Sequence, residues 1–185
     1  MAGGRSMWEW GLDPMCLSHV KLLSFDLLSL QKPNTRGGSE PFWRKGRPVR
    51  KVEMVGVVVS RERKDKFLKF ELDDGSGCVP CILWLNHMTN RYYPKTDQLQ
   101  MESMAAMALK QAEQVQLGRL VRVQGRITLY NKQLQITVSS AVVEKDPNAE
   151  ILHWMECIRL AVRCYDMSAP LPPSHNLSDA GRKRS

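Results

Sequence analysis

The chain has 185 residues, 43% of them hydrophobic, which allows one folded domain with extensions and excludes a wholly disordered protein. Its formal net charge is +8, and residues 44–66 alone hold nine basic and three acidic side chains. This concentration is typical of a polyanion-binding protein, but also of a well-solvated surface. No apolar run is long enough to span a membrane, and residues 1–6 lack the apolar core of a secretory signal. The five cysteines are therefore expected to be reduced.

The first third of the chain gives mixed signals. Residues 1–9 are expected to form a flexible terminus, and Asp13-Pro14 is a favourable helix start, because Asp can cap and Pro suits the first helical position. The apolar residues in 20–30 fit either a helix or one face of a strand, and the pattern does not decide between them. Residues 31–41 have the composition of a loop.

From residue 49 onward the pattern predicts strands. Residues 49–60 are rich in valine and form a long first strand, in which Gly56 indicates a bulge or bend. After a polar turn over 61–66, residues 67–73 alternate between apolar and polar side chains, as a half-buried strand does. Asp74-Gly75 is a hairpin turn signal, and residues 78–85 return as the third strand.

The second half adds helices and two further strands. The connection over residues 86–118 is expected to end in a helix, capped by Thr96 or Asp97 and stopped by Gly118. Two strands, 120–127 and 134–143, flank a turn at Tyr130-Asn131-Lys132. A terminal helix over 146–165 opens at Asp146-Pro147, and residues 167–185 are expected to be a disordered tail.

The order of these elements predicts the fold. Three strands, a helix and two more strands are the arrangement of the OB-fold, a mainly β, five-stranded Greek-key barrel. A small closed barrel needs a long first strand that bends, which fits Gly56. We therefore expect one domain over residues 10–166, with an N-terminal extension and a C-terminal helix.

The sequence offers little to suggest an enzyme or a cofactor. It has no phosphate-cradling glycine motif and no nucleophile elbow. Cys78 and Cys81 form a CxxC spacing, but no second pair completes a zinc site, and on a strand the two sulfurs point to opposite faces. Asp73-Asp74 stands before Gly75, so a turn is favoured over a metal site. No catalytic residue, metal or cofactor is expected.

Aromatic and basic side chains are the better candidates for a site. If Val79, Cys81 and Leu83 fill the barrel, then Pro80, Ile82 and Trp84 face outward. An outward Trp84 is a platform on which a base can stack, or else packs beneath another part of the chain or a neighbour. Tyr130 lies in a turn that OB-folds use to grip oligonucleotides. Basic candidates for phosphate contact are Arg61, Lys66, Arg126 and Lys132.

The terminal helix carries a second candidate surface. Ile151, Met155, Ile158 and Val162 recur at steps of four and three residues, and Trp154 widens the apolar stripe. Such a helix packs either on its own barrel or against a partner, and Trp and Met suit a protein interface.

Taken in order, these features resemble a known family. The features are Trp10-Gly11-Leu12-Asp13-Pro14, the Val55-Gly56-Val57-Val58 strand, Asp73-Asp74 and Gly77 followed by Cys81 and Trp84, Gly125 with Tyr130, and the final helix. They resemble the Stn subunit of the trimeric CST telomere-capping complex, in its short, plant-type form, and more distantly the middle subunit of replication protein A.

The resemblance implies a function that the pattern alone does not give. It implies a nuclear, telomeric protein that binds single-stranded telomeric DNA, protects chromosome ends and supports fill-in by DNA polymerase alpha-primase. Positions matching Trp84 and Tyr130 contact the single strand in that family, and a basic residue matches Thr128, where this chain departs. Asp73, Ile151 and Trp154 match positions that face the small Ten-type subunit, and Met155 and Ile158 extend that helix face. A large Ctc-type subunit completes the complex, and residues 20–30 are expected to add a strand.

Two alternatives remain open at this point. One is an OB-fold interaction scaffold, or a subunit like the middle one of replication protein A, with little DNA contact of its own. The other is a zinc or thiol-redox protein that uses Cys78 and Cys81.

Overall fold

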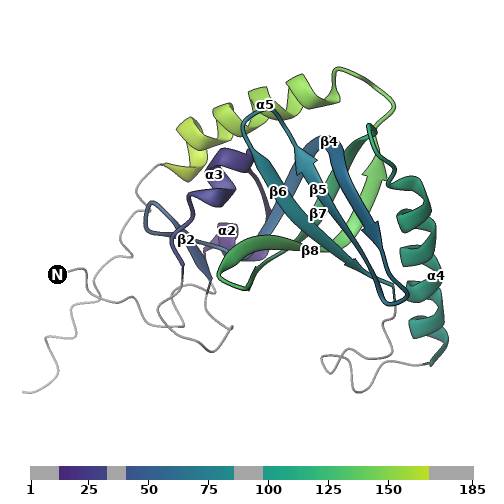
Figure 1. Ribbon diagram of the computed structural model, residues 1–185. Coiled ribbons are helices and arrows are strands. Elements are labelled where there is room, and N and C mark those ends of the chain that lie inside the picture. Colours follow the sequence, from purple (N-terminus) through teal and green to yellow (C-terminus); the bar gives the residue numbers. More distant parts are fainter. Residues whose placement is uncertain (1–12, 33–40, 86–97, 167–185) are drawn as a thin grey trace, which may run out of the picture.

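A closed five-stranded barrel forms the body of the molecule (Figure 1). The computed structural model describes residues 13–32, 41–85 and 98–166, with side chains from 102 in the last range. The barrel strands are β4 (Lys51–Arg63), β5 (Phe67–Asp73), β6 (Cys78–Trp84), β7 (Leu120–Tyr130) and β8 (Gln133–Val143). They follow the order β4–β5–β6–β8–β7, and β4 pairs back with β7 to close the ring. This is the predicted OB-fold, with valine, leucine and isoleucine side chains from every strand in its core.

Strand β4 serves both halves of the barrel. Residues 51–57 pair with β7, and from Val57 onward the strand pairs with β5, with a register shift between Val58 and Ser60. A Cβ on Gly56 would lie 2.7 Å from the carbonyl oxygen of Asp73, so the backbones approach too closely for any side chain there. The irregularity expected at Gly56 lies instead between Val58 and Ser60, and the strand runs to Arg63, into the segment expected to be a turn.

The N-terminal extension wraps the open side of β4. It contains α2 (Pro14–Leu17), β1 (His19–Lys21) and α3 (Ser24–Leu28). The Asp13 carboxylate accepts from the backbone N–H of Met15 at 2.9 Å, which is the predicted helix cap. Strand β1 pairs in parallel with β4. The ambiguous segment 20–30 is therefore a short strand followed by a short helix.

A hairpin before β4 was not predicted. Strands β2 (Phe42–Arg44) and β3 (Arg47–Val49) pair across a two-residue turn, in which Lys45 has φ 47° and Gly46 has φ 81°. Both positive angles fit a type I′ turn. Val49 belongs to this hairpin, so the expected start of the first barrel strand at residue 49 was wrong by two residues.

The expected helix between the third and fourth barrel strands is α4 (Gln98–Gln114). Ala108 and Ala112 are buried on its inner face. The helix ends four residues before Gly118, whose φ of 74° reverses the chain and whose N–H donates to the Val58 carbonyl at 2.8 Å. The cap candidates Thr96 and Asp97 lie outside the described residues.

The turn between β7 and β8 is tighter than expected. Asn131 and Lys132 alone form it, with φ of 47° and 65°. Tyr130 is the last residue of β7 and pairs with Gln133, so the strand expected to stop at residue 127 continues for three more. Tyr130 is thereby held by a strand.

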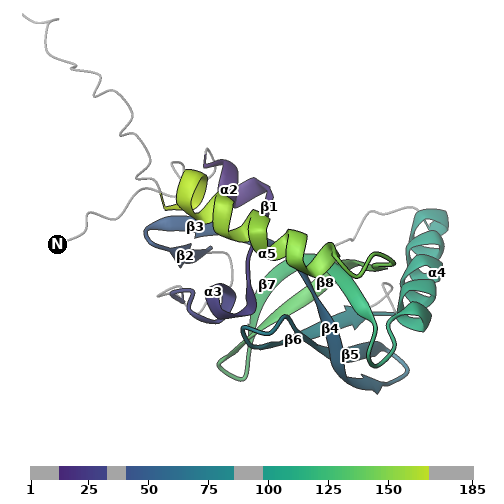
Figure 2. The same ribbon diagram turned by 90° about the horizontal axis from the view of Figure 1, so that it is seen from above.

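The terminal helix lies along the barrel and the N-terminal extension (Figure 2). It consists of α5 (Ala149–Leu160) and a π-helical turn, η2 (Ala161–Tyr165). Asp146 and Pro147 precede it in a turn, in which the Asp146 carboxylate accepts from the N–H of Asn148 at 2.8 Å. The expected helix is confirmed, but it starts at residue 149 and not at 146.

Helix α5 faces the barrel with Ala149, His153 and Cys157, which are buried. A polar network joins the same surfaces, because Lys21 on β1 pairs with both Glu156 of α5 and Glu53 of β4. Burial alone would raise the pKa of Glu53, but hydrogen bonds from Gln124 and Arg122 outweigh it and hold that pKa below its usual range. Within the described ranges, no helix has the length and apolar character to cross a lipid bilayer.

Candidate nucleic-acid interface

Two aromatic rings meet on the outer face where β5 begins and β6 ends. Phe67 and Trp84 are opposite residues of this antiparallel pair, so their side chains lie on the same face. Their ring centroids are 5.7 Å apart, at an interplanar angle of 73°. Trp84 keeps 40% of its surface exposed. An exposed indole held edge-to-face by a second ring is a preorganised stacking surface.

Lys69 links this pair to the third ring. Its Nζ lies 5.4 Å from the ring centroid of Phe67 and 5.5 Å from that of Tyr130. Tyr130 itself is 56% exposed. We call Phe67, Lys69, Trp84 and Tyr130 the aromatic face. Lys69 lies between two of its rings, and Lys64 approaches Phe67 at 5.8 Å, so cations stand beside stacking surfaces, the combination that holds a phosphate beside stacked bases.

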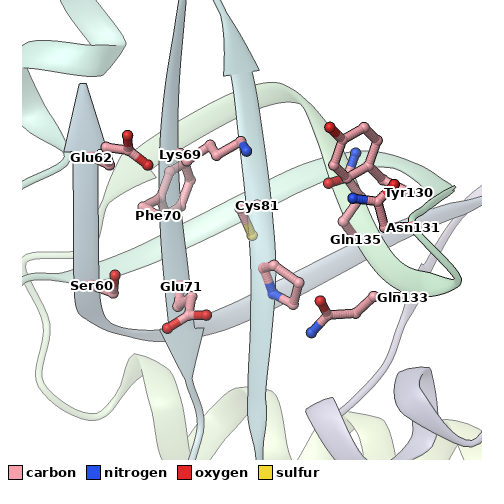
Figure 3. Close-up of a pocket in the computed structure, with 11 residues that line it drawn as sticks. Ser60, Glu62, Lys69, Phe70, Glu71, Cys81, Tyr130, Asn131, Gln133 and Gln135 are labelled. Carbon is pink, nitrogen blue, oxygen red and sulfur yellow. The ribbon is translucent and has the colours of Figure 1, made fainter. Parts of the chain in front are cut away.

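A cavity of about 280 Å³ lies beneath Tyr130 (Figure 3). Its walls come from β4, β5, β6 and the β7–β8 hairpin, and the lining residues are Ser60, Glu62, Lys69, Phe70, Glu71, Pro80, Cys81, Tyr130, Asn131, Gln133 and Gln135. The amides and hydroxyl can donate to or accept from a base edge. The carboxylates of Glu62 and Glu71 repel a phosphate, although the Lys64 ammonium pairs with that of Glu62 at 3.0 Å. The cavity therefore suits the neutral part of a nucleotide better than its backbone.

The other predicted contacts on β7 and its turn lie beside this face. Thr128 is half-buried, and its hydroxyl lies 3.0 Å from the Thr137 hydroxyl. Arg126 is exposed at the next outward position of the strand. Lys132 is exposed at the tip of the turn, where its carbonyl accepts from the Lys32 ammonium at 2.7 Å. The N-terminal extension thus adds a further cation at this end.

Lys66 and Arg61 lie in different parts of the structure, Lys66 beside Trp84 and Arg61 at the end of α4. Lys66 is exposed in the β4–β5 turn, and its carbonyl accepts from the Leu85 N–H at 2.9 Å, which places it next to Trp84. Arg61 pairs in register with buried Phe70. Its guanidinium donates to the carbonyls of Val115 and Ala112, at 2.8 and 3.3 Å. Arg61 therefore binds the end of α4 and lies away from the aromatic face.

The exposed side of α5 forms a second surface. We call Ile151, Met155, Ile158 and Val162 the helix stripe, and their side chains are 55–70% exposed. Trp154 is half-buried beside it, and its indole N–H donates to the Asp74 carbonyl at 2.9 Å. A shallow hollow lined by Glu150, Ile151 and Trp154 joins this corner to the stripe. An apolar surface of this kind on an otherwise packed helix is typical of a protein interface.

Asp73 lies at the same corner. Its carboxylate accepts from the N–H of Gly75 at 2.8 Å. A Cβ on Gly75 would lie 4.0 Å from the Trp154 ring, so the turn and the helix are in contact. The structure thus brings Asp73 close to Trp154 and Ile151, which lie about eighty residues further along the chain and which no local sequence pattern connects to it.

Comparisons with known proteins match this geometry. Residues 52–144 fit the family described as OB-fold nucleic acid binding domain. A protein of Arabidopsis thaliana named CST complex subunit STN1 is 45% identical over 148 residues, which cover 80% of this chain and 92% of that protein. The chain belongs to the STN1 family of CST complex subunits. An STN1 protein of Ailuropoda melanoleuca is 29% identical over 165 residues, and the chain spans 44% of its length.

Two solved structures share the fold of this chain. One is the crystal structure of the S. pombe Stn1–Ten1 complex, with a TM-score of 0.61 at 18% identity, covering 78% of this chain and 92% of that chain. The other is a replication protein A heterotrimer bound to single-stranded DNA, with a TM-score of 0.60 at 15% identity, covering 78% and 96%. At these identities the likeness establishes the OB-fold alone.

The two cysteines of the CxxC spacing lie apart, as the strand geometry predicts. Cys78 is exposed at the start of β6, and Cys81 is buried in the barrel. Burial and the nearby Glu71 raise the pKa of the Cys81 thiol, and slight burial and Asp73 raise that of Cys78, so neither is an activated thiolate. Among the described residues, no group of three or more His, Cys, Asp or Glu side chains gathers into a metal site.

Sequence reasoning missed Phe67 and Lys69. The signal was present, because both residues occupy the positions of the 67–73 alternation that point away from the core. A phenylalanine at such a position must face outward. Ile82 shares the outward face with Lys69, with which it pairs, but it is buried at 6% exposure. It lies between Lys69 of β5 and Thr137 of β8, which pair with it on either side and cover it.

Proposed function

We propose that the chain binds single-stranded telomeric DNA as a subunit of a CST-type complex, protecting chromosome ends and supporting telomere replication and C-strand fill-in. The observation that carries this proposal is the aromatic face, where Trp84 and Tyr130 are exposed and Lys69 lies between the rings of Phe67 and Tyr130. Single-strand binding requires stacking surfaces next to cations, and this face supplies both above a polar cavity.

Assembly with partners is part of the proposal. The helix stripe, with Trp154 and Asp73 at its end, is suited to a small Ten-type OB subunit, and a large Ctc-type subunit and DNA polymerase alpha-primase complete the machinery. The names of the relatives and the Stn1–Ten1 structure support this assignment. The same names support a nuclear, telomeric location and a role that involves no catalysis.

A second candidate is a scaffold that holds other subunits and contacts DNA weakly, like the middle subunit of replication protein A. Two observations favour it. Glu62 and Glu71 lower the positive field of the cavity, and the helix stripe is more exposed than the aromatic face. Thr128 also favours the scaffold, because the family has a basic residue at that position.

The test is single-strand binding by the assembled complex. Loss of stacking costs about 1–3 kcal/mol per base, so Trp84→Ala and Tyr130→Ala are each expected to weaken binding of a G-rich strand by about 5- to 150-fold. Phe25→Ala is the matched control, because Phe25 is 68% exposed on α3, beside the far end of β6. Fluorescence anisotropy at fixed salt measures the affinities. Unchanged binding by the double variant would favour the scaffold.

A further inference from the structure

Three basic side chains stand side by side on neighbouring strands. His19 of β1 pairs with Lys51 of β4, and Lys51 pairs with Arg126 of β7. Directly paired residues point to the same face, with Cβ atoms about 4.5–5.5 Å apart in an antiparallel pair. Arg126 is exposed, and His19 and Lys51 are half-buried. We call these three residues the basic row.

The protein leaves the charges of the basic row uncompensated. Like charges directly opposite each other destabilise a sheet. Within the part of the chain that the structure describes, no carboxylate forms an ion pair with Lys51 or Arg126. Burial, and next the charge of Lys51, lower the pKa of His19 against an opposing effect of Glu53, so His19 joins the row as a neutral imidazole that can donate a hydrogen bond.

The nearest acid is already engaged. Glu53 lies one pair further along β4 on the same face, and it accepts from Arg122 at 2.8 Å and from Gln124 at 2.6 Å. Lys21 approaches it at 3.6 Å. Glu53 is therefore not free to relieve the repulsion between Lys51 and Arg126.

The basic row continues the aromatic face. Arg126, Thr128 and Tyr130 occupy alternate outward positions of β7. Four residues of strand span about 13 Å, and each step to the next strand adds about 4.8 Å. A chain that leaves Tyr130 along β7 therefore meets Arg126, then Lys51, then His19.

We propose that the basic row is a phosphate-binding extension of the interface, which guides the backbone of a single strand from Tyr130 across β7 and β4 to β1. This inference rests on the proposed function. The ligand is the phosphodiester backbone, and the contacts are charges that position the strand without reading its sequence. The N-terminal extension takes part in binding, because β1 supplies the last member of the row.

The proposal predicts a dependence on strand length. OB-folds occupy about 4–16 nucleotides, so a thymidine oligomer at the lower limit covers the aromatic face alone, and one at the upper limit reaches the row. One neutralised phosphate contributes a slope of about 0.7 in the logarithm of the binding constant against that of salt. Lys51→Gln should therefore lose about eightfold in affinity for the long oligomer at about 50 mM salt and almost none at about 1 M.

The test uses the full chain with both oligomers, titrated at several salt concentrations. Lys51→Gln is compared with Lys110→Gln, since Lys110 is exposed on α4. The expected result is a smaller salt slope for Lys51→Gln with the long oligomer and wild-type binding of the short one. The proposal is overturned if Lys51→Gln weakens binding of both oligomers equally, or if it weakens binding no more than Lys110→Gln does.

The same titration separates this inference from the proposed function. A short oligomer that binds regardless of Trp84 and Tyr130 removes the proposed function, whereas loss of length dependence removes only the basic row. Failure of the isolated wild-type chain to bind either oligomer overturns the basic row and leaves the proposed function to the test on the assembled complex.

Discussion

Asp74 ties three parts of the molecule together, and its removal gives a sharp prediction. Only 2% of the residue is exposed. Its carboxylate accepts from the N–H of Ser24, at the start of α3, at 2.7 Å. It also accepts from the N–H and the hydroxyl of Ser76, at 3.0 and 2.7 Å. Its carbonyl receives the indole N–H of Trp154 on α5. We therefore expect Asp74→Ala to loosen the junction between extension, barrel and terminal helix.

The size of the loss follows from which donors water can reach. A hydrogen bond to a charged group contributes about 1.5–3 kcal/mol. Ser24 is fully buried, so its N–H is left without a partner and the whole amount is lost. Ser76 is partly exposed, and water replaces most of its two bonds, leaving about 0.5–1 kcal/mol for each. The free energy of unfolding should fall by about 3–4 kcal/mol in total.

Urea and thermal unfolding measure this loss. For a chain of this size, about 3–4 kcal/mol corresponds to a midpoint lower by roughly 10 °C. Asp146→Ala is the matched control, because the Asp146 carboxylate accepts from a neighbouring N–H in the same way but is exposed. That variant should lose less than about 1 kcal/mol. A loss for Asp74→Ala no larger than that of the control would refute the reasoning.

Two further predictions concern the helix stripe and the thiols. Ile151→Ser with Ile158→Ser should weaken capture of a small Ten-type OB subunit by at least about tenfold and leave the unfolding midpoint unchanged, since both side chains are more than half exposed. Leu17→Ser is the exposed control on α2, and retained binding by the double variant would remove the stripe from the interface. Cys78 and Cys164 are exposed and should be alkylated faster than Cys81, which is buried, and Cys157, whose pKa burial raises to about 12. Joint protection of Cys78 and Cys81, lifted by a chelator, would instead support the zinc alternative.

The barrel was predictable because its signals are local. Alternation over β5, the turn at Asp74-Gly75 and the valines around Gly56 each depend on near neighbours, and together they specify five strands and an inserted helix. The β2–β3 hairpin was missed because its turn is Lys45-Gly46, in which lysine takes a positive φ that no lysine signal announces. The end of β7 was missed for the same reason, since Lys132 also turns with a positive φ.

The site was less predictable because it depends on contacts between distant strands. Trp84 and Tyr130 were found as isolated outward aromatics. Their connection through Lys69 requires the parallel pairing of β6 with β8, which no short-range pattern reveals. The basic row likewise needs the register of β1, β4 and β7 at once. The contacts of Arg61 could not be foreseen, because its partner carbonyls belong to the end of α4, more than fifty residues away.

Strand β8 also determines when this protein can fold during its synthesis. It is the last strand to leave the ribosome, and it joins both β6 and β7, so the ring stays open until Val143 has emerged. Until then, the edges of β6 and β7 that β8 will occupy have no partner, and pairing between strands distant in sequence is slow. The helix that follows at once carries the exposed stripe. A newly made chain therefore closes its barrel and presents its apolar helix at nearly the same moment, which favours capture by a partner before the stripe meets a second unassembled chain.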